Sequence, residues 1–383
     1  KLGILGDDNR VLKISVPGRG GYGISLIDEG PAFADKTRRF KIAWWGVGGS
    51  GDEAKPDRGA SLCVAFSPDG LHWTPWPNNP ALPGVDDIVD VYWDPIRSRY
   101  GTFFKTSSDQ TDGYTRGSRA GGHVRRLVSA SVSDDFTHWQ RSWRVLMPEP
   151  RDEGQQEFYS VGGTIVRGGV LIGFARMLHD DYPPNQGDPA NGIGYATLVT
   201  SRDGVRWERH DDIFFDRNPD PNAWDRAMTW IGSTLPVEDE LYIYYGGYKR
   251  GHKVEPTRER QLGLAKMPMD RLVSRDAVGD KIGRLLTVPL RLPEGGVHQL
   301  VLNASAAGGR IRVQLRDAKE GAVLSGYGLD DCVPIDGDGS ALPVVWKGKK
   351  ELPRDTVRME LEIAKAGVFG FRAAPVEAGP GGG

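Results

Sequence analysis

Short apolar runs recur along the first two thirds of the chain, each bounded by Gly, Pro or Asp. One pair covers residues 89–93 and 100–104, with a turn at Asp94-Pro95 between them, and a third run covers 127–132. The runs are rich in β-branched and aromatic residues, and none has a sustained helical period, so they predict strands joined in hairpins. Equivalent sets lie at 24–27, 40–45 and 61–66, at 163–166, 170–174 and 193–199, and at 230–235, 241–245 and 262–265.

A seven-residue motif follows the third run of each of the first three sets. It reads Ser-Pro-Asp-Gly-Leu-His-Trp from Ser67, Ser-Asp-Asp-Phe-Thr-His-Trp from Ser133 and Ser-Arg-Asp-Gly-Val-Arg-Trp from Ser201, at intervals of 66 and 68 residues. A degenerate fourth copy at 269–272 keeps an Asp but lacks the Trp. A fixed long period indicates one supersecondary unit that is reused. Four antiparallel strands per unit, repeated radially, predict an all-β fold of the β-propeller type.

Four blades are visible in this repeat, and we expect five, with residues 1–16 and part of 274–292 completing the ring. Beyond Leu285 the repeat stops and alternating polar and apolar residues predict half-buried strands of a small β-sandwich. The expected domains are therefore a five-bladed propeller over 1–284, a C-terminal β-sandwich over 285–378 and a frayed tail over 379–383.

The charge balance and the absent motifs exclude several classes of function. The 49 basic and 51 acidic residues give a net charge of −2, which offers no electrostatic case for nucleic acid or for an anionic membrane. No transmembrane run or signal peptide is recognisable. The chain has no CxxC, no HExxH and no glycine-rich phosphate loop, so metal-dependent and redox chemistry have little support. Cys63 and Cys332 are expected to be small core residues rather than a disulfide pair.

The Asp residues of the repeated motif are expected to be structural. Asp69, Asp135 and Asp203 lie in the hairpins between the third and fourth strands, where an Asp accepts backbone N–H bonds and fixes the corner. Asp94, in a turn between the first and second strands, has the same expected role. The three Trp residues that end the motif are interpreted as packing residues.

A second set of carboxylates lies just ahead of the first strand of three consecutive blades. These are Asp87, Glu157 and Asp225, at intervals of 70 and 68 residues that match the blade period. In an up-and-down blade the start of the first strand lies at the channel mouth, on the face opposite the structural hairpins. Three carboxylates in register favour catalysis or ligand binding over solvated loop charges.

Long polar loops are expected on the same face, at 105–126, 177–191 and 246–252. Loops of this length and composition usually carry function, and these are rich in residue types that bind sugars. The candidate substrate-binding residues are Asp90, His123, Arg126, Arg176, Trp224, Arg226, Tyr248 and His252.

These motifs together resemble the five-bladed β-propeller glycoside hydrolases, in particular proteins of the family 32 and family 43 type with a C-terminal β-sandwich. The match is carried by the Ser-x-Asp-Gly-x-x-Trp turns, by Tyr92-Trp93-Asp94-Pro95, by Glu157-Phe158-Tyr159 and by Trp224-Asp225. The resemblance implies hydrolysis of an oligo- or polysaccharide, with a furanoside or fructoside as a plausible substrate, and a secreted or periplasmic location. It implies no cofactor, and it allows a single structural Ca²⁺ in the propeller channel.

The resemblance also assigns roles to the three carboxylates. Glu157 is expected to be the general acid, because Phe158, Tyr159 and nearby carboxylates would help it to hold a proton. Asp87 is expected to be the base or the carboxylate that tunes charge, with Asp90 as the fallback, and Asp225 is the third member. Whether the enzyme retains or inverts configuration stays open.

One departure from the family pattern keeps other functions open. The first visible blade begins through residues 18–23 without a carboxylate, where relatives have a nucleophile or base. A segment upstream could supply it, Asp225 could replace it, or hydrolysis could be lost. The alternatives are therefore a non-catalytic carbohydrate-binding propeller and a glycoside phosphorylase, whose phosphate the Arg and His residues at 123–126 and 249–252 would bind.

Overall fold

The computed structural model describes residues 2–6, 8–12, 22–46, 61–107, 126–149, 152, 156–179, 192–252 and 259–376. Two compact units form, Lys1–Leu235 with Tyr242–Ala265 and Pro236–Leu241 with Lys266–Gly383. The only helical segment of this described part is one 3₁₀ turn, η1 (Lys36–Arg38), so the predicted all-β class is confirmed. No helix in the described part is long and apolar enough to cross a membrane.

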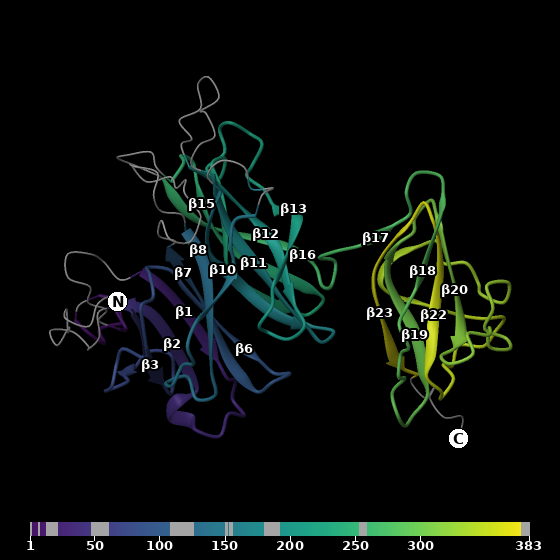
Figure 1. The fold of residues 1–383 in the computed structure, drawn as a ribbon, viewed down its shortest axis with the longest axis horizontal. Helices are drawn as coiled ribbons and strands as arrows, with labels where there is room; N and C mark the ends of the chain where they lie inside the picture. Colours follow the sequence, from purple (N-terminus) through teal and green to yellow (C-terminus); the bar gives the residue numbers. More distant parts are fainter. Residues whose placement is uncertain are drawn as a thin grey trace. The chain divides into compact units, whose positions relative to one another are not determined.

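The described residues of the first unit form four blades of consecutive antiparallel strands (Figure 1). The order within a blade follows the chain, as expected for units joined by hairpins. The first blade comprises β1 (Tyr22–Asp28), β2 (Phe40–Gly46), β3 (Ser61–Ser67) and β4 (Thr74–Pro75), with β5 (Leu82–Pro83) also paired to β3. The second blade comprises β6 (Val89–Asp94), β7 (Arg99–Ser107), β8 (Arg126–Ser133) and β9 (Trp143–Leu146).

The third and fourth blades are joined into one seven-stranded sheet. A parallel bridge between Gly194 and Met228 connects them. The backbone N–H of Gly194 also donates to the carbonyl oxygen of Ala227 at 3.0 Å. The third blade comprises β10 (Gln156–Arg167), β11 (Val170–His179), β12 (Ile193–Ser201) and β13 (Glu208–Phe215), and the fourth comprises β14 (Met228–Val237), β15 (Glu240–Tyr248) and β16 (Arg260–Pro268).

The first strands of successive blades lie next to one another, as a propeller requires. The Ser25 hydroxyl of β1 accepts a hydrogen bond from the backbone N–H of Val91 in β6 at 3.0 Å. The Thr234 hydroxyl of β14 donates to the carbonyl oxygen of Gly163 in β10 at 2.7 Å. Apolar side chains fill the spaces between blades, for example Trp45 with Phe104 and Phe136 between the first and second. The structure is therefore a β-propeller, as predicted.

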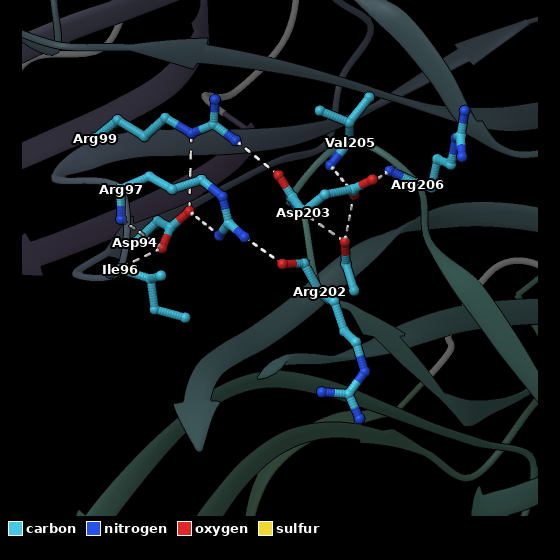
Figure 2. A network of polar contacts seen from close by, with 10 residues as sticks. Asp94, Ile96, Arg97, Arg99, Arg202, Asp203, Val205 and Arg206 are labelled. Carbon is cyan, nitrogen blue, oxygen red and sulfur yellow. Dashed lines mark hydrogen bonds and ion pairs between the residues drawn. The ribbon is translucent and has the colours of Figure 1, made fainter. Parts of the chain in front are cut away.

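The repeated motif forms the expected structural turns (Figure 2 shows the third copy). In that copy the Asp203 carboxylate accepts hydrogen bonds from the backbone N–H groups of Val205 and Arg206, at 2.8 and 2.7 Å. The same pattern recurs at Asp69 and Asp135. The motif Trp side chains pack between strands, and their predicted structural role is confirmed.

The predicted fifth blade does not form from the stretch expected to supply it. β17 (Arg275–Asp276) and β18 (Ile282–Leu286) pair with strands of the second unit. The prediction that this stretch completes the ring is wrong, because the alternation of β18 suits the sandwich core, where Leu285 packs. On β1, at one end of the described blades, Ile24 and Leu26 are 55% and 51% exposed. The blade count of five stays a prediction.

The second unit is a β-sandwich, which confirms the fold predicted for the C-terminal part. One sheet has the order β17-β23-β19-β21 and the other β18-β22-β20. Their inner faces share one core, in which Leu302, Ile311 and Trp346 are buried. Apart from Pro236–Leu241, the unit starts at Lys266, ahead of the predicted boundary at 285. The remaining strands are β19 (His298–Ser305), β20 (Arg310–Asp317), β21 (Asp338–Pro343), β22 (Val357–Ala364) and β23 (Gly367–Pro375).

Candidate active site

Asp87 lies just ahead of β6 and is bound by a buried lysine. The Lys105 side chain, near the end of β7, is 3% exposed. Its Nζ donates a hydrogen bond to Asp87 Oδ1 and lies 3.4 Å from Asp86 Oδ2. A buried ammonium group is costly unless it is paired. Lys105 therefore fixes the position of the Asp87 carboxylate at the start of the second blade.

Glu157, the second residue of β10, is fully buried. Arg126, the first residue of β8, donates from Nη1 to Glu157 Oε2, so the ion pair joins the second and third blades. The sequence predicts an apolar environment for this carboxylate. The structure adds a guanidinium group, whose charge favours the ionised form of a neighbouring carboxylate.

The aromatic ring of Tyr159 brings these two ion pairs together. Lys105 Nζ lies 5.2 Å and Arg126 Cζ 5.0 Å from the ring centroid, in cation–π geometry. The rings of Trp230 and His252 pack against Tyr159, with centroid distances of 4.6 and 5.5 Å. We call Asp87, Lys105, Arg126, Glu157 and Tyr159 the Tyr159 cluster. Through Lys105 and Arg126 it links two carboxylates from neighbouring blades to one ring.

Asp225 belongs to a separate set of contacts. Its Oδ2 accepts a hydrogen bond from the Tyr245 hydroxyl at 2.8 Å, and this is its only side-chain partner among the described residues. Burial and this bond raise the pKa of Tyr245 to about 12. The Trp224 ring stacks on Tyr245 with a centroid distance of 5.7 Å. Asp225 is therefore held by β15, and no hydrogen bond or ion pair joins it to the Tyr159 cluster in the described part of the chain.

Asp90 and Arg176 form a buried ion pair between β6 and β11. Arg176 Nη2 donates to Asp90 Oδ1 at 2.7 Å, and its Nε donates to the carbonyl oxygen of Ile231 in β14 at 2.8 Å. Burial raises the pKa of Asp90, while the charge of Arg176 acts in the opposite direction. The pair ties together strands of three blades.

The other candidate substrate-binding residues have different surroundings. The rings of Tyr248 and His252 pack beside Trp230. Trp224 uses its ring face to stack on Tyr245. Arg226 donates from Nη1 to the carbonyl oxygen of Pro221 at 2.7 Å, within its own loop. His123 lies outside the described residues. The binding roles of these residues remain predictions.

Sequence reasoning missed Lys105 and Trp230 as parts of the site and treated Tyr159 only as an apolar neighbour of Glu157. A usable signal exists for Lys105, because it directly follows the apolar run Tyr100–Phe104 in a strand. Its partner Asp87 is 18 residues away, a separation that no local pattern encodes.

The described residues provide no set of ligands for a metal ion. Within the described ranges, no group of three or more His, Cys, Asp or Glu side chains lies close enough to hold an ion. Cys63 and Cys332 are buried, and neither is part of a disulfide. A structural Ca²⁺ in the channel stays a prediction.

No family model and no curated protein matches this chain. Solved structures are similar at low identity. A glycoside hydrolase shares 15% identity at a TM-score of 0.44, covering 68% of this chain and 73% of that one. A Bombyx mori family 32 β-fructofuranosidase shares 12% identity at a TM-score of 0.37, covering 88% of this chain and 76% of that one.

A β-1,2-mannobiose phosphorylase from Listeria innocua shares 11% identity at a TM-score of 0.39, covering 61% of this chain and 56% of that one. The similar structures include glycoside hydrolases, the class of protein that the sequence motifs resemble. All three TM-scores lie below 0.5. The function proposed below rests on this chain's own side chains.

Proposed function

We propose that this protein is a glycoside hydrolase that cleaves an oligo- or polysaccharide at the Tyr159 cluster. One observation carries the proposal. Asp87 and Glu157, at the starts of neighbouring blades, are each paired with a cation, and both cations, Lys105 and Arg126, lie over the same aromatic ring. A carboxylate that is buried beside a specific charged partner, as Glu157 is, is a candidate for a functional site.

The proposed chemistry is acid–base catalysis by two carboxyl groups. Glu157 protonates the leaving oxygen, and Asp87 acts as the base or tunes the charge of the site. For Glu157 to act as an acid, bound substrate has to draw Arg126 away, because a paired guanidinium favours the carboxylate form. The hydroxyl groups of a sugar are suitable competing partners for Arg126. Asp225 takes part only if the substrate reaches the Tyr245 side of the fourth blade.

A second candidate, glycoside phosphorylase activity, is favoured by the two cations of the cluster. Lys105 and Arg126 lie on the same ring, and both types of side chain bind phosphate. Phosphate would then replace water as the group that attacks the sugar. The two reactions differ in their dependence on inorganic phosphate and in their product, which is a sugar 1-phosphate after attack by phosphate and a free sugar after attack by water.

The test is turnover of a panel of aryl glycosides and natural oligosaccharides, with and without inorganic phosphate. The variants are Glu157→Gln and Asp87→Asn. Asp134→Asn is the matched control, because Asp134 is exposed in a structural turn. We expect the wild type and the control to release sugar. Loss of a general acid or base should lower kcat by roughly 10²–10⁴-fold in the two site variants.

Turnover that survives in Glu157→Gln would show that the assignment of the acid is wrong. Turnover that needs phosphate would replace the hydrolase with the phosphorylase. Oligosaccharide binding without turnover under either condition would refute both reactions and leave a carbohydrate-binding propeller.

A further inference from the structure

The outer face of the three-stranded sheet in the sandwich unit carries charged side chains. Along β22, Met359, Leu361 and Ile363 point into the core. The alternate positions Arg358, Glu360 and Glu362 must therefore lie on the opposite face. The same sheet is labelled β18, β22 and β20 in Figure 1.

The cross-strand pairs on this face are complementary at two positions and repulsive at the third. Arg312 faces Glu362 and bonds to it at 2.6 Å, and Gln314 faces Glu360 and bonds to it at 2.6 Å. The next pair in register is Arg316 opposite Arg358. Like charges directly opposite each other destabilise an antiparallel pair. Glu360, 2.6 Å from Arg316, compensates the charge of Arg316, so Arg358 is the member of this pair whose charge the sheet leaves uncompensated.

A hollow of about 490 Å³ opens at this pair of arginines. That volume lies within the range of about 300–1,000 Å³ typical of ligand sites. The turn after β20 forms one wall, since Asp317 Oδ1 accepts from the N–H groups of Lys319 and Glu320, and Arg316 Nη1 donates to the carbonyl oxygen of Gly321. The lining residues of this sandwich hollow are Arg284, Leu286, Arg316, Ala318, Lys319, Glu320, Gly321, Arg358 and Glu360.

The sandwich hollow carries excess positive charge. Its lining contains four cationic and two acidic residues. Glu360 is already occupied by Arg316, whose Nε lies 2.6 Å from Glu360 Oε2. Among the described residues the side chains of Arg358 and Lys319 form no hydrogen bond or ion pair, although the charge of Lys319 acts on the neighbouring Asp317 carboxylate. Because the whole chain has a net charge of −2, this local excess is not a general property of the surface.

We propose that the sandwich hollow binds an anionic saccharide, through oxyanions on its sugar rings. That the ligand is a saccharide rests on the proposed function of the propeller, whereas its negative charge is inferred from the lining of the hollow alone. Arginine presents its N–H groups in a planar fork that matches carboxylate and sulfate oxygens. None of the lining residues is aromatic, so the site lacks the flat surface on which neutral sugars stack. Charge is the recognition element that this lining provides.

The test is isothermal titration calorimetry on the full chain with three polymers at low ionic strength. Polygalacturonate presents carboxylates, dextran sulfate presents sulfates, and dextran is neutral. The Glu157→Gln variant serves as background so that turnover does not contribute heat. The site variant is Lys319→Ala/Arg358→Ala. The control is Arg372→Ala, since Arg372 is exposed on β23 in the other sheet.

We expect binding to at least one anionic polymer and none to dextran. The double variant should weaken binding by about a hundredfold, at roughly tenfold for each cationic side chain removed, while Arg372→Ala stays near the parent. Thermal unfolding checks the fold, and the double variant should be no less stable because it removes a like-charge pair. Binding to polygalacturonate alone would identify carboxylate as the ligand, and binding to dextran sulfate alone would identify sulfate.

Three results would overturn the proposal: no binding to either anionic polymer, equal binding by the double variant and its parent, or an equal loss in Arg372→Ala. Each concerns binding, whereas the propeller function is read from turnover. A failure of the proposed anion site can therefore be distinguished from a failure of the proposed hydrolase activity.

Discussion

Arg97, in the turn between β6 and β7, donates from Nη2 to the backbone carbonyl oxygen of Arg202 in the next blade (Figure 2). Asp94 holds Arg97 in place, with its Oδ2 2.9 Å from Arg97 Nη1. Arg99 donates in parallel to the carbonyl oxygen of Asp203 at 3.1 Å. This inter-blade clasp lets one blade's turn bind the repeated motif of its neighbour. The repeated motif therefore stabilises its own turn, and its backbone carbonyl oxygens also accept hydrogen bonds from the adjacent blade.

The inter-blade clasp predicts an unequal pair of substitutions. Asp94→Ala removes a carboxylate that is 1% exposed, together with the anchor for Arg97, and should cost roughly 2–4 kcal/mol in the free energy of unfolding. Arg202→Ala should change it by less than about 0.5 kcal/mol, because only the backbone of Arg202 takes part. Urea denaturation at pH 7 measures both. Equal losses would mean that the clasp does not act through the backbone acceptor.

The buried pair of Asp90 and Arg176 predicts a second, larger effect. Arg176→Met strands the Asp90 carboxylate and leaves the Ile231 carbonyl oxygen without its donor. Breaking such a pair should cost about 3–5 kcal/mol. The double variant Asp90→Asn/Arg176→Met should lose less than Arg176→Met, because no unpaired charge remains. Denaturant unfolding of the single and double variants checks this order. A larger loss in the double variant would contradict the account.

Two adjacent glycines of β15 predict opposite outcomes. A Cβ on Gly247 would lie 2.2 Å from the Trp224 ring and 2.8 Å from Asp225 Cβ. Gly247→Ala should therefore displace Asp225 and cost about 1–3 kcal/mol. A Cβ on Gly246 meets nothing closer than 4.0 Å, so Gly246→Ala is the matched control and should be nearly neutral. Thermal unfolding of the two variants, with near-ultraviolet circular dichroism of the Trp environment, distinguishes them. An equal response would show that Trp224 can move aside.

The structural turns predict a dependence of stability on pH. Hydrogen bonds from the backbone N–H groups of Arg206 and Val205 lower the pKa of Asp203 below its ordinary value of about 3.9. The stabilisation from this carboxylate is fully present above the unfolded-state value, and it disappears as pH falls through the lower folded-state value. Asp203→Asn should thus be less stable than the wild type at pH 7, and the difference should shrink below about pH 4. Urea unfolding at several pH values measures it, and a constant difference would refute the mechanism.

The local parts of the fold follow from the sequence. The hairpins and the Asp turns depend on residues within a few positions of each other, such as Asp69 with His72, and the motif spacing repeats them. The assignment of β18 was missed, because alternating residues do not specify which sheet they join. The blade count is likewise not determined by local pattern.

The candidate site was predictable only in part. Blade period alone placed Asp87 and Glu157 at equivalent positions, and both belong to the Tyr159 cluster. Their cations and the shared ring come from other strands, so the pairings needed the folded chain. Asp225 lies at the equivalent position of the next blade, but its carboxylate contacts β15. Gly247 in that strand has no side chain, and this leaves room for the Trp224 ring beside Asp225. Sequence period predicts where a side chain starts and not which neighbour it meets.

The bridge between β12 and β14 makes one seam of the ring unlike the others. Across it two hydrogen bonds run from backbone to backbone, from Gly194 to Ala227 and from His252 to Gly192, beside side-chain bonds such as that of Thr234 to Gly163. Between the earlier blades the hydrogen bonds of the described residues involve a side chain on at least one side. A side chain that bonds to the next blade can change rotamer while the two blades slide past each other. Two backbones that are hydrogen-bonded directly cannot slide without breaking those hydrogen bonds. We therefore expect the third and fourth blades to move together, and relative motion of the described blades to occur mainly at the two earlier seams.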